Sequence, residues 1–138
     1  MKRATLVAFA CLLSLALLSW ADDMNLRPSA AVPGAQGRLN VEHDKNGNSS
    51  LKIQVSHLAQ PSSLSPPATD YVVWIQPEGR AAEAAGVLQV GKDLNGELTT
   101  TTPYQKFDVF ITAENSPHPE APTGPEVMRG MVTQTPAR

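Results

Sequence analysis

Cysteine is almost absent from this 138-residue chain, and its single copy, Cys11, lies inside an apolar N-terminal run. The rest of the chain therefore has no residue that could form a disulfide or supply a thiol. Basic clusters are missing as well, because 11 Lys and Arg residues are scattered among 13 Asp and Glu residues, for a net charge of −2. Nucleic-acid and polybasic membrane binding both need a concentrated positive surface. We therefore expect neither kind of partner.

Helical periodicity is also missing from the region after the N-terminal run. The one helix-friendly stretch, residues 81–85, is bracketed by Gly79 and Gly86 and has room for a single turn. Apolar residues instead alternate with polar ones, which is typical of half-buried β-strands. This alternation predicts strands at residues 38–43, 50–57, 71–75, 87–92, 97–102, 107–112 and 126–132.

The third predicted strand, residues 71–75, is apolar on both faces and carries Trp74. Such a strand belongs in the centre of a fold, covered on both sides, and Pro77 should end it because proline cannot donate to a sheet ladder. Long proline-rich loops at 59–70 and 115–125 suit crossings between sheets. The pattern predicts an all-β domain, a seven-stranded immunoglobulin-like β-sandwich, with a partly open β-barrel as the alternative.

Two turns share the pattern Asp-x-Asn-Gly, at residues 44–47 and 93–96. A three-residue loop with Gly47 in the left-handed conformation puts Val41 opposite Leu51, which keeps both side chains on the core face. The same register applied to the second turn pairs strand 87–92 with strand 97–102 and sets Val90 opposite Thr100. Both turns are thus predicted to close hairpins.

The N-terminus has the three parts of a secretory signal peptide. Lys2 and Arg3 are followed by an apolar run from residue 4 to residue 18, and small residues stand at Ser19 and Ala21. We expect a signal peptide at 1–21, a flexible lead-in at 22–36 and a β-sandwich domain at 37–138. The alternative is an uncleaved membrane anchor at 4–21, and a lipoprotein is disfavoured because Cys11 does not close the apolar run. The location predicted is secreted or periplasmic.

Reactive constellations are hard to find in the sequence. Residues 44–48 look like part of a calcium loop, but glycine stands at the fourth position and no acidic residue follows at the twelfth. The three histidines, His43, His57 and His118, are not spaced as zinc or copper ligands, and no Gly-x-Ser-x-Gly elbow or phosphate loop occurs. We expect no enzyme, and no catalytic, cofactor-binding or metal-ligating residue.

Several segments of the second half of the chain resemble one known family. They are YVVWI at 71–75, GVL at 86–88, LTTT at 98–101, FDVFITAE at 107–114 and PTGP at 122–125. Together they resemble the C-terminal, extracytoplasmic domain of bacterial anti-sigma-K-type factors. The resemblance covers residues 70–132 and implies an immunoglobulin-like sandwich, a non-enzymatic role and a place in the bacterial envelope. Only residues 1–3 precede the apolar segment here, so we expect the outer module without a cytoplasmic sigma-binding domain.

The function expected from these features is an exported, non-enzymatic interaction module with a protein or envelope component as partner. The alternative is a periplasmic small-ligand or metal-binding carrier of cupredoxin-like shape. Binding residues tend to lie on loops of a rigid scaffold, which points to the proline-rich loops at 59–69 and 117–125. A membrane is expected as a partner only if residues 4–21 remain as an anchor.

Overall fold

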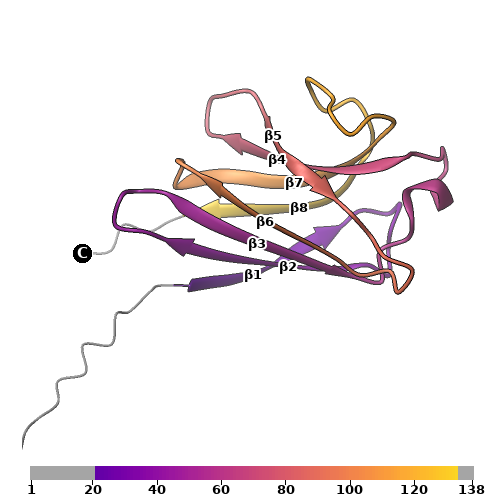
Figure 1. Ribbon diagram of the computed structural model, residues 1–138, viewed down its shortest axis with the longest axis horizontal. Helices are drawn as coiled ribbons and strands as arrows, with labels where there is room; N and C mark the ends of the chain where they lie inside the picture. Colours follow the sequence, from indigo (N-terminus) through magenta and orange to yellow (C-terminus); the bar gives the residue numbers. More distant parts are fainter. Residues whose placement is uncertain (1–20, 134–138) are drawn as a thin grey trace, which may run out of the picture.

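The computed structural model describes residues 21–133 as a β-fold with a single short 3₁₀ turn (Figure 1). The expected export signal at 1–21 lies, apart from its last residue, outside the described part. The elements are β1 Ala21–Pro28, β2 Gln36–His43, β3 Ser49–Ser56, η1 Pro61–Ser63, β4 Asp70–Pro77, β5 Glu83–Leu88, β6 Gly96–Thr102, β7 Lys106–Glu114 and β8 Glu126–Thr133.

All eight strands belong to one antiparallel sheet, in the order β5-β4-β7-β8-β1-β2-β3-β6. The sheet folds over so that β1, β2, β3 and β6 face β5, β4, β7 and β8 (Figure 1). Strand β1 joins the two halves, because it pairs with β2 along most of its length and with β8 through Arg27 and Pro28. The prediction of an all-β fold is confirmed, and the arrangement is a nearly closed barrel.

Strand β1 is the element that the sequence did not predict. Residues 22–36 were expected to form a flexible lead-in, whereas residues 21–26 pair with β2 in continuous register and residues 27 and 28 pair with β8. Met24 and Leu26 turn apolar side chains toward the core, and Asn25 between them is polar. Asp and Asn have low strand propensity, so this strand is stabilised by its neighbours rather than by its own sequence.

Strand β4 is buried on both faces, as its unbroken apolar sequence predicted. Tyr71, Val73 and Ile75 point into the barrel and join the main core. Val72 and Trp74 point outward, where Trp74 stacks on Phe110 of β7 with 6.4 Å between ring centroids. The strand ends at Pro77, also as predicted. The half of the barrel around β4 and β7 therefore carries a second, smaller apolar cluster on its outer side.

The two Asp-x-Asn-Gly turns behave differently. In the β2–β3 hairpin Val41 faces Leu51, His43 faces Ser49 and Gly47 has a φ of +84°, which confirms the predicted register and turn. The second hairpin prediction is wrong, because β5 pairs with β4 rather than with β6. At the second turn, only an isolated bridge connects Val90 to Gly96 in the described part of the chain. Gly86 and the alanines before it belong to β5 and lie along the edge of β4. The strand predicted at 87–92 therefore begins earlier, at residue 83.

Candidate functional site

The two proline-rich loops, expected from sequence to carry binding, meet at one end of the barrel. Residues 66–68 of the first loop and residues 119 and 123–125 of the second line a cleft of about 350 Å³. Backbone hydrogen bonds fix both loops to the end of β7, from Thr69 N to Glu114 O at 3.0 Å and from Ala113 N to Pro125 O at 3.0 Å. The cleft therefore has walls from both loops and a floor from β7.

Glu114 lies at the floor of this cleft, and its side chain is only 2 % exposed. Its carboxylate accepts hydrogen bonds from the Thr112 and Thr123 hydroxyls, each at 2.5 Å. It also accepts from the backbone N–H groups of Thr123 and Gly124, the latter at 3.0 Å. A buried carboxylate with this many donors is well satisfied. It clamps the loop at 115–125 to the strand from which the loop leaves.

The hydrogen-bond chain continues from Glu114 to the outer apolar cluster. Thr112 Oγ1 accepts a hydrogen bond from the indole Nε1–H of Trp74 at 2.8 Å, and the Thr112 hydroxyl donates its own hydrogen bond to Glu114. Trp74, Thr112, Glu114, Thr123 and Gly124 all lie in the segments that carry the family resemblance. The structure thus brings together residues of three separate motifs, and no local sequence pattern indicates that Glu114 connects them.

The environment of Glu114 determines what it can do chemically. Burial by itself would raise the pKa of Glu114, but the hydrogen bonds from Thr112, Thr123 and Gly124 outweigh burial and hold the pKa below its ordinary value. The carboxylate is therefore ionised at neutral pH, and its lone pairs point at donors within the protein. This arrangement suits a structural clamp, whereas a general acid would need a raised pKa.

The three histidines are dispersed over the described part of the chain. His43 Nδ1 lies 2.9 Å from Ser49 Oγ, which itself donates to the backbone oxygen of Tyr104. Ser49 must therefore accept a hydrogen bond from His43 Nδ1–H, and His43 Nε2 is buried without a partner in the described part of the chain. His57 has a φ of 55° just after β3, and His118 is exposed in the second proline-rich loop.

The turn at 44–48, which resembles a fragment of a calcium loop, uses its own polar groups. Asp44 Oδ1 accepts hydrogen bonds from the backbone N–H groups of Asn46 at 2.8 Å and Asn48 at 2.9 Å. The hydrogen bond from Asn48 N–H is the largest of the effects that lower the pKa of the Asp44 carboxyl. Within residues 21–133, no group of three or more His, Cys, Asp or Glu residues could hold a metal ion.

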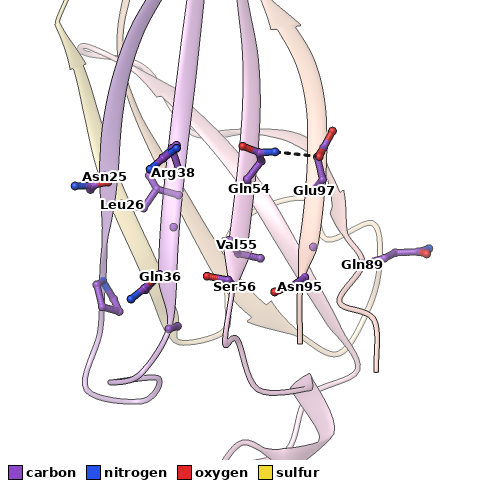
Figure 2. A pocket seen from close by; sticks show the side chains of 14 residues that line it. Asn25, Leu26, Gln36, Arg38, Gln54, Val55, Ser56, Gln89, Asn95 and Glu97 are labelled. Atoms are coloured by element: carbon purple, nitrogen blue, oxygen red, sulfur yellow. Dashed lines mark hydrogen bonds between the residues drawn. The ribbon is translucent and has the colours of Figure 1, made fainter. Parts of the chain in front are cut away.

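A second hollow lies on the outer surface of β1, β2, β3 and β6, with a volume of about 940 Å³ (Figure 2). We call it the polar groove. Figure 2 shows its side chains in two levels across the strands, with Asn25, Arg38, Gln54 and Glu97 at one level and Gln36, Ser56 and Asn95 at the other. The groove shares no residue with the proline-loop cleft. Local sequence patterns do not reveal it, because its residues come from four strands and from the loops beside them.

The chain was compared with known protein families and with curated proteins. No family model matches it, and no curated protein matches it significantly. None of the helical structure within residues 21–133 is long and apolar enough to span a membrane.

Proposed function

We propose that this chain is an exported, non-enzymatic binding module of the bacterial cell envelope, with the proline-loop cleft as its contact surface for a protein or envelope component. The observation that carries the proposal is the Glu114 clamp. It holds an eleven-residue loop, residues 115–125, in one arrangement through hydrogen bonds from Thr112, Thr123 and Gly124. A loop ordered in advance loses less conformational entropy when a partner binds.

The export part of the proposal is supported by the N-terminal sequence. Lys2 and Arg3, the apolar run after them and the small residues Ser19 and Ala21 have the order of a signal peptide. The envelope setting is supported by the resemblance to the outer domain of anti-sigma-K-type factors. The clamp adds to this, because residues of the resembling motifs contact one another through Trp74, Thr112 and Glu114.

The binding surface can be tested by site-specific photocrosslinking of the full-length protein in the producing cells. A photoreactive amino acid at position 120, which is exposed in the second loop, should form an adduct with an envelope component. The same group at position 45 is the matched control. This position is in the β2–β3 turn, which precedes β3, whereas the first proline-rich loop follows β3. Equal adducts at both positions, or none at position 120, would contradict the proposal.

The adduct should also depend on the clamp. Substituting Gln for Glu114 frees the loop while leaving the surface residue at position 120 in place, so the adduct should weaken severalfold. Glu120→Gln without a crosslinker, assayed by competition with the wild type, should change binding only if the loop surface is used. An adduct that persists unchanged when the clamp is removed would show that loop order is irrelevant to binding.

A further inference from the structure

We propose that the polar groove on β1, β2, β3 and β6 binds a hydroxyl-rich polysaccharide chain. The proposal goes beyond the proline-loop cleft and does not depend on it. It begins from the volume of the hollow, about 940 Å³, which is large enough for several sugar units. The hollow runs over the face of four neighbouring strands and reaches Gln89 and Asn95 in the segment between β5 and β6 (Figure 2).

The strand register places the groove side chains in a row. Asn25 of β1 pairs with Arg38 of β2, Arg38 with Gln54 of β3, and Gln54 with Glu97 of β6. Partners in adjacent strands share a face and lie about 4.8 Å apart from strand to strand. The result is a straight line of hydrogen-bonding groups across the sheet. A second line, from Gln36 to Ser56, lies two residues further along the strands.

Much of the hydrogen-bonding capacity in these rows is unused by the protein. Within residues 21–133, no side-chain hydrogen bond or ion pair engages Asn25, Gln36 or Arg38. The adjacent row is different, since Asn40 donates to Asp23 at 2.7 Å and Lys52 pairs with Glu97 at 3.6 Å. In the groove itself Glu97 also accepts a hydrogen bond from Gln54 at 3.3 Å, so the free hydrogen-bonding groups belong to Asn25, Gln36 and Arg38.

The chemistry of the row favours a polyol over other ligands. Amide side chains both donate and accept, and so do the hydroxyl groups of sugars, so each can match the other in either direction. Arg38 adds a planar fork of donors near the middle of the row. The charges nearly cancel, because Glu97 is paired with Lys52 and leaves Arg38 as the free charge. Nucleic acid needs a basic surface, which a single unpaired cation does not supply.

The groove also predicts how binding should depend on chain length. No aromatic ring lines it, so affinity must come from many hydrogen bonds, each of modest strength. A single sugar can reach one row only, whereas an oligosaccharide can reach both. Affinity should therefore rise with each added unit until the rows are filled and then level off.

The test is affinity electrophoresis of the full-length protein in gels that contain dextran, mannan, xylan or alginate. At least one polysaccharide should retard the protein, and isothermal titration with its oligosaccharides should show the rise with chain length. The neutral polysaccharides and the uronate polymer alginate distinguish a hydroxyl ligand from one that also offers carboxylates to Arg38. Retardation by none of the four would overturn the proposal.

Variants identify the surface. Arg38→Ala should weaken binding about tenfold, because the loss of a charged donor from a binding site is comparable to one decade in Kd. Lys45→Ala, which removes a cation from the exposed β2–β3 turn, should leave affinity within about twofold. Equal affinities of the two variants would overturn the proposal. Unchanged melting temperatures would show that both remain folded, and adducts at position 120 should form in both.

Discussion

At the scale of single residues, Glu114 is the side chain on which the second proline-rich loop depends most. Its carboxylate has only acceptors, and donors from Thr112, Thr123 and Gly124 surround it. A neutral amide of the same shape would turn an N–H₂ group toward some of these donors and leave them unsatisfied. An unsatisfied buried donor is more costly than the loss of an average hydrogen bond.

We expect Glu114→Gln to lower the free energy of unfolding by about 2 kcal/mol, measured by urea denaturation. Glu120→Gln, an exposed change of the same kind in the same loop, should alter it by less than about 0.5 kcal/mol. The wild type should also lose stability as pH falls from about 4.5 through the lower pKa of folded Glu114, because protonation removes the clamp. This acid-dependent loss should be smaller in Glu114→Gln, and identical acid profiles would refute the assignment.

Tyr71 should make the stability of the protein depend on pH at the alkaline end of the range. Its ring is fully buried, its hydroxyl donates to the backbone oxygen of Ala59 at 2.5 Å, and burial raises the pKa of Tyr71 to about 12. In the unfolded chain the Tyr71 hydroxyl ionises near pH 10, whereas in the folded protein it keeps its proton above that pH. Ionisation therefore stabilises the unfolded state relative to the folded state. Stability should therefore be complete below pH 10 and fall by up to about 2 kcal/mol between pH 10 and 12.

Tyr71→Phe provides the comparison for this alkaline loss. The variant should be less stable at neutral pH by about 1 kcal/mol, since Ala59 loses its donor. It should also show a flatter stability profile above pH 10, measured by urea denaturation at each pH. A variant that keeps the wild-type alkaline loss would mean that some other group titrates there.

At the scale of elements, the second proline-rich loop returns to β7 through a close backbone contact at Gly124. A Cβ atom at this position would lie far inside the van der Waals radius of the Ala113 backbone oxygen. The backbone bond from Ala113 N–H to Pro125 O lies beside the contact. The loop can therefore only pass β7 at this distance with glycine in place.

We expect Gly124→Ala to force the loop away from β7 and to lower the free energy of unfolding by about 2–3 kcal/mol. Limited proteolysis should cut the variant within residues 115–125 faster than the wild type. Gly34→Ala is the matched control, because nothing lies within 4 Å of a Cβ there. Wild-type stability and protease resistance in Gly124→Ala would show that the loop is not held at this point.

The elements also show where sequence reasoning succeeds. Alternation located β2, β3 and β7, and the turn at Gly47 fixed the β2–β3 register, because one misplaced residue would have exposed a whole apolar face. Strand β1 has too few apolar residues to be recognised from its sequence, and it depends on pairing with β2. The pairing of β5 with β4 was hidden because Ala84, Ala85 and Gly86 have little strand propensity.

The candidate sites were harder to predict from the sequence than the strands, for a related reason. The loops at 59–69 and 117–125 could be named from their prolines, and they do meet in the structure. The role of Glu114 and the row from Asn25 to Glu97 depend on which strands are neighbours. That order is a property of the folded sheet, and local patterns do not contain it.

At the scale of the whole molecule, the barrel has a seam between β5 and β6, the two edge strands of the sheet. Among residues 21–133 an isolated bridge from Val90 to Gly96 joins the two edges. Side chains close the rest of the seam: Leu98 reaches within 3.1 Å of where a Cβ on Gly86 would lie, and the Tyr104 hydroxyl donates to Glu83 at 3.2 Å. Long hydrogen-bonded ladders join β2 to β3, β4 to β7 and β7 to β8, and a short ladder at Arg27 and Pro28 joins β1 to β8.

This difference makes the seam the expected place of local opening. Leu98→Ala should remove its main apolar contact and lower the free energy of unfolding by about 1–2 kcal/mol. Hydrogen exchange should then accelerate in β5 and β6 by more than in β4 and β7, because the edge strands can separate without unfolding the centre. Met131→Ala, at an exposed side chain on β8, should leave all four strands unchanged. An equal acceleration in β4, β5, β6 and β7 would mean that the barrel opens as one cooperative unit and that the seam has no independent stability.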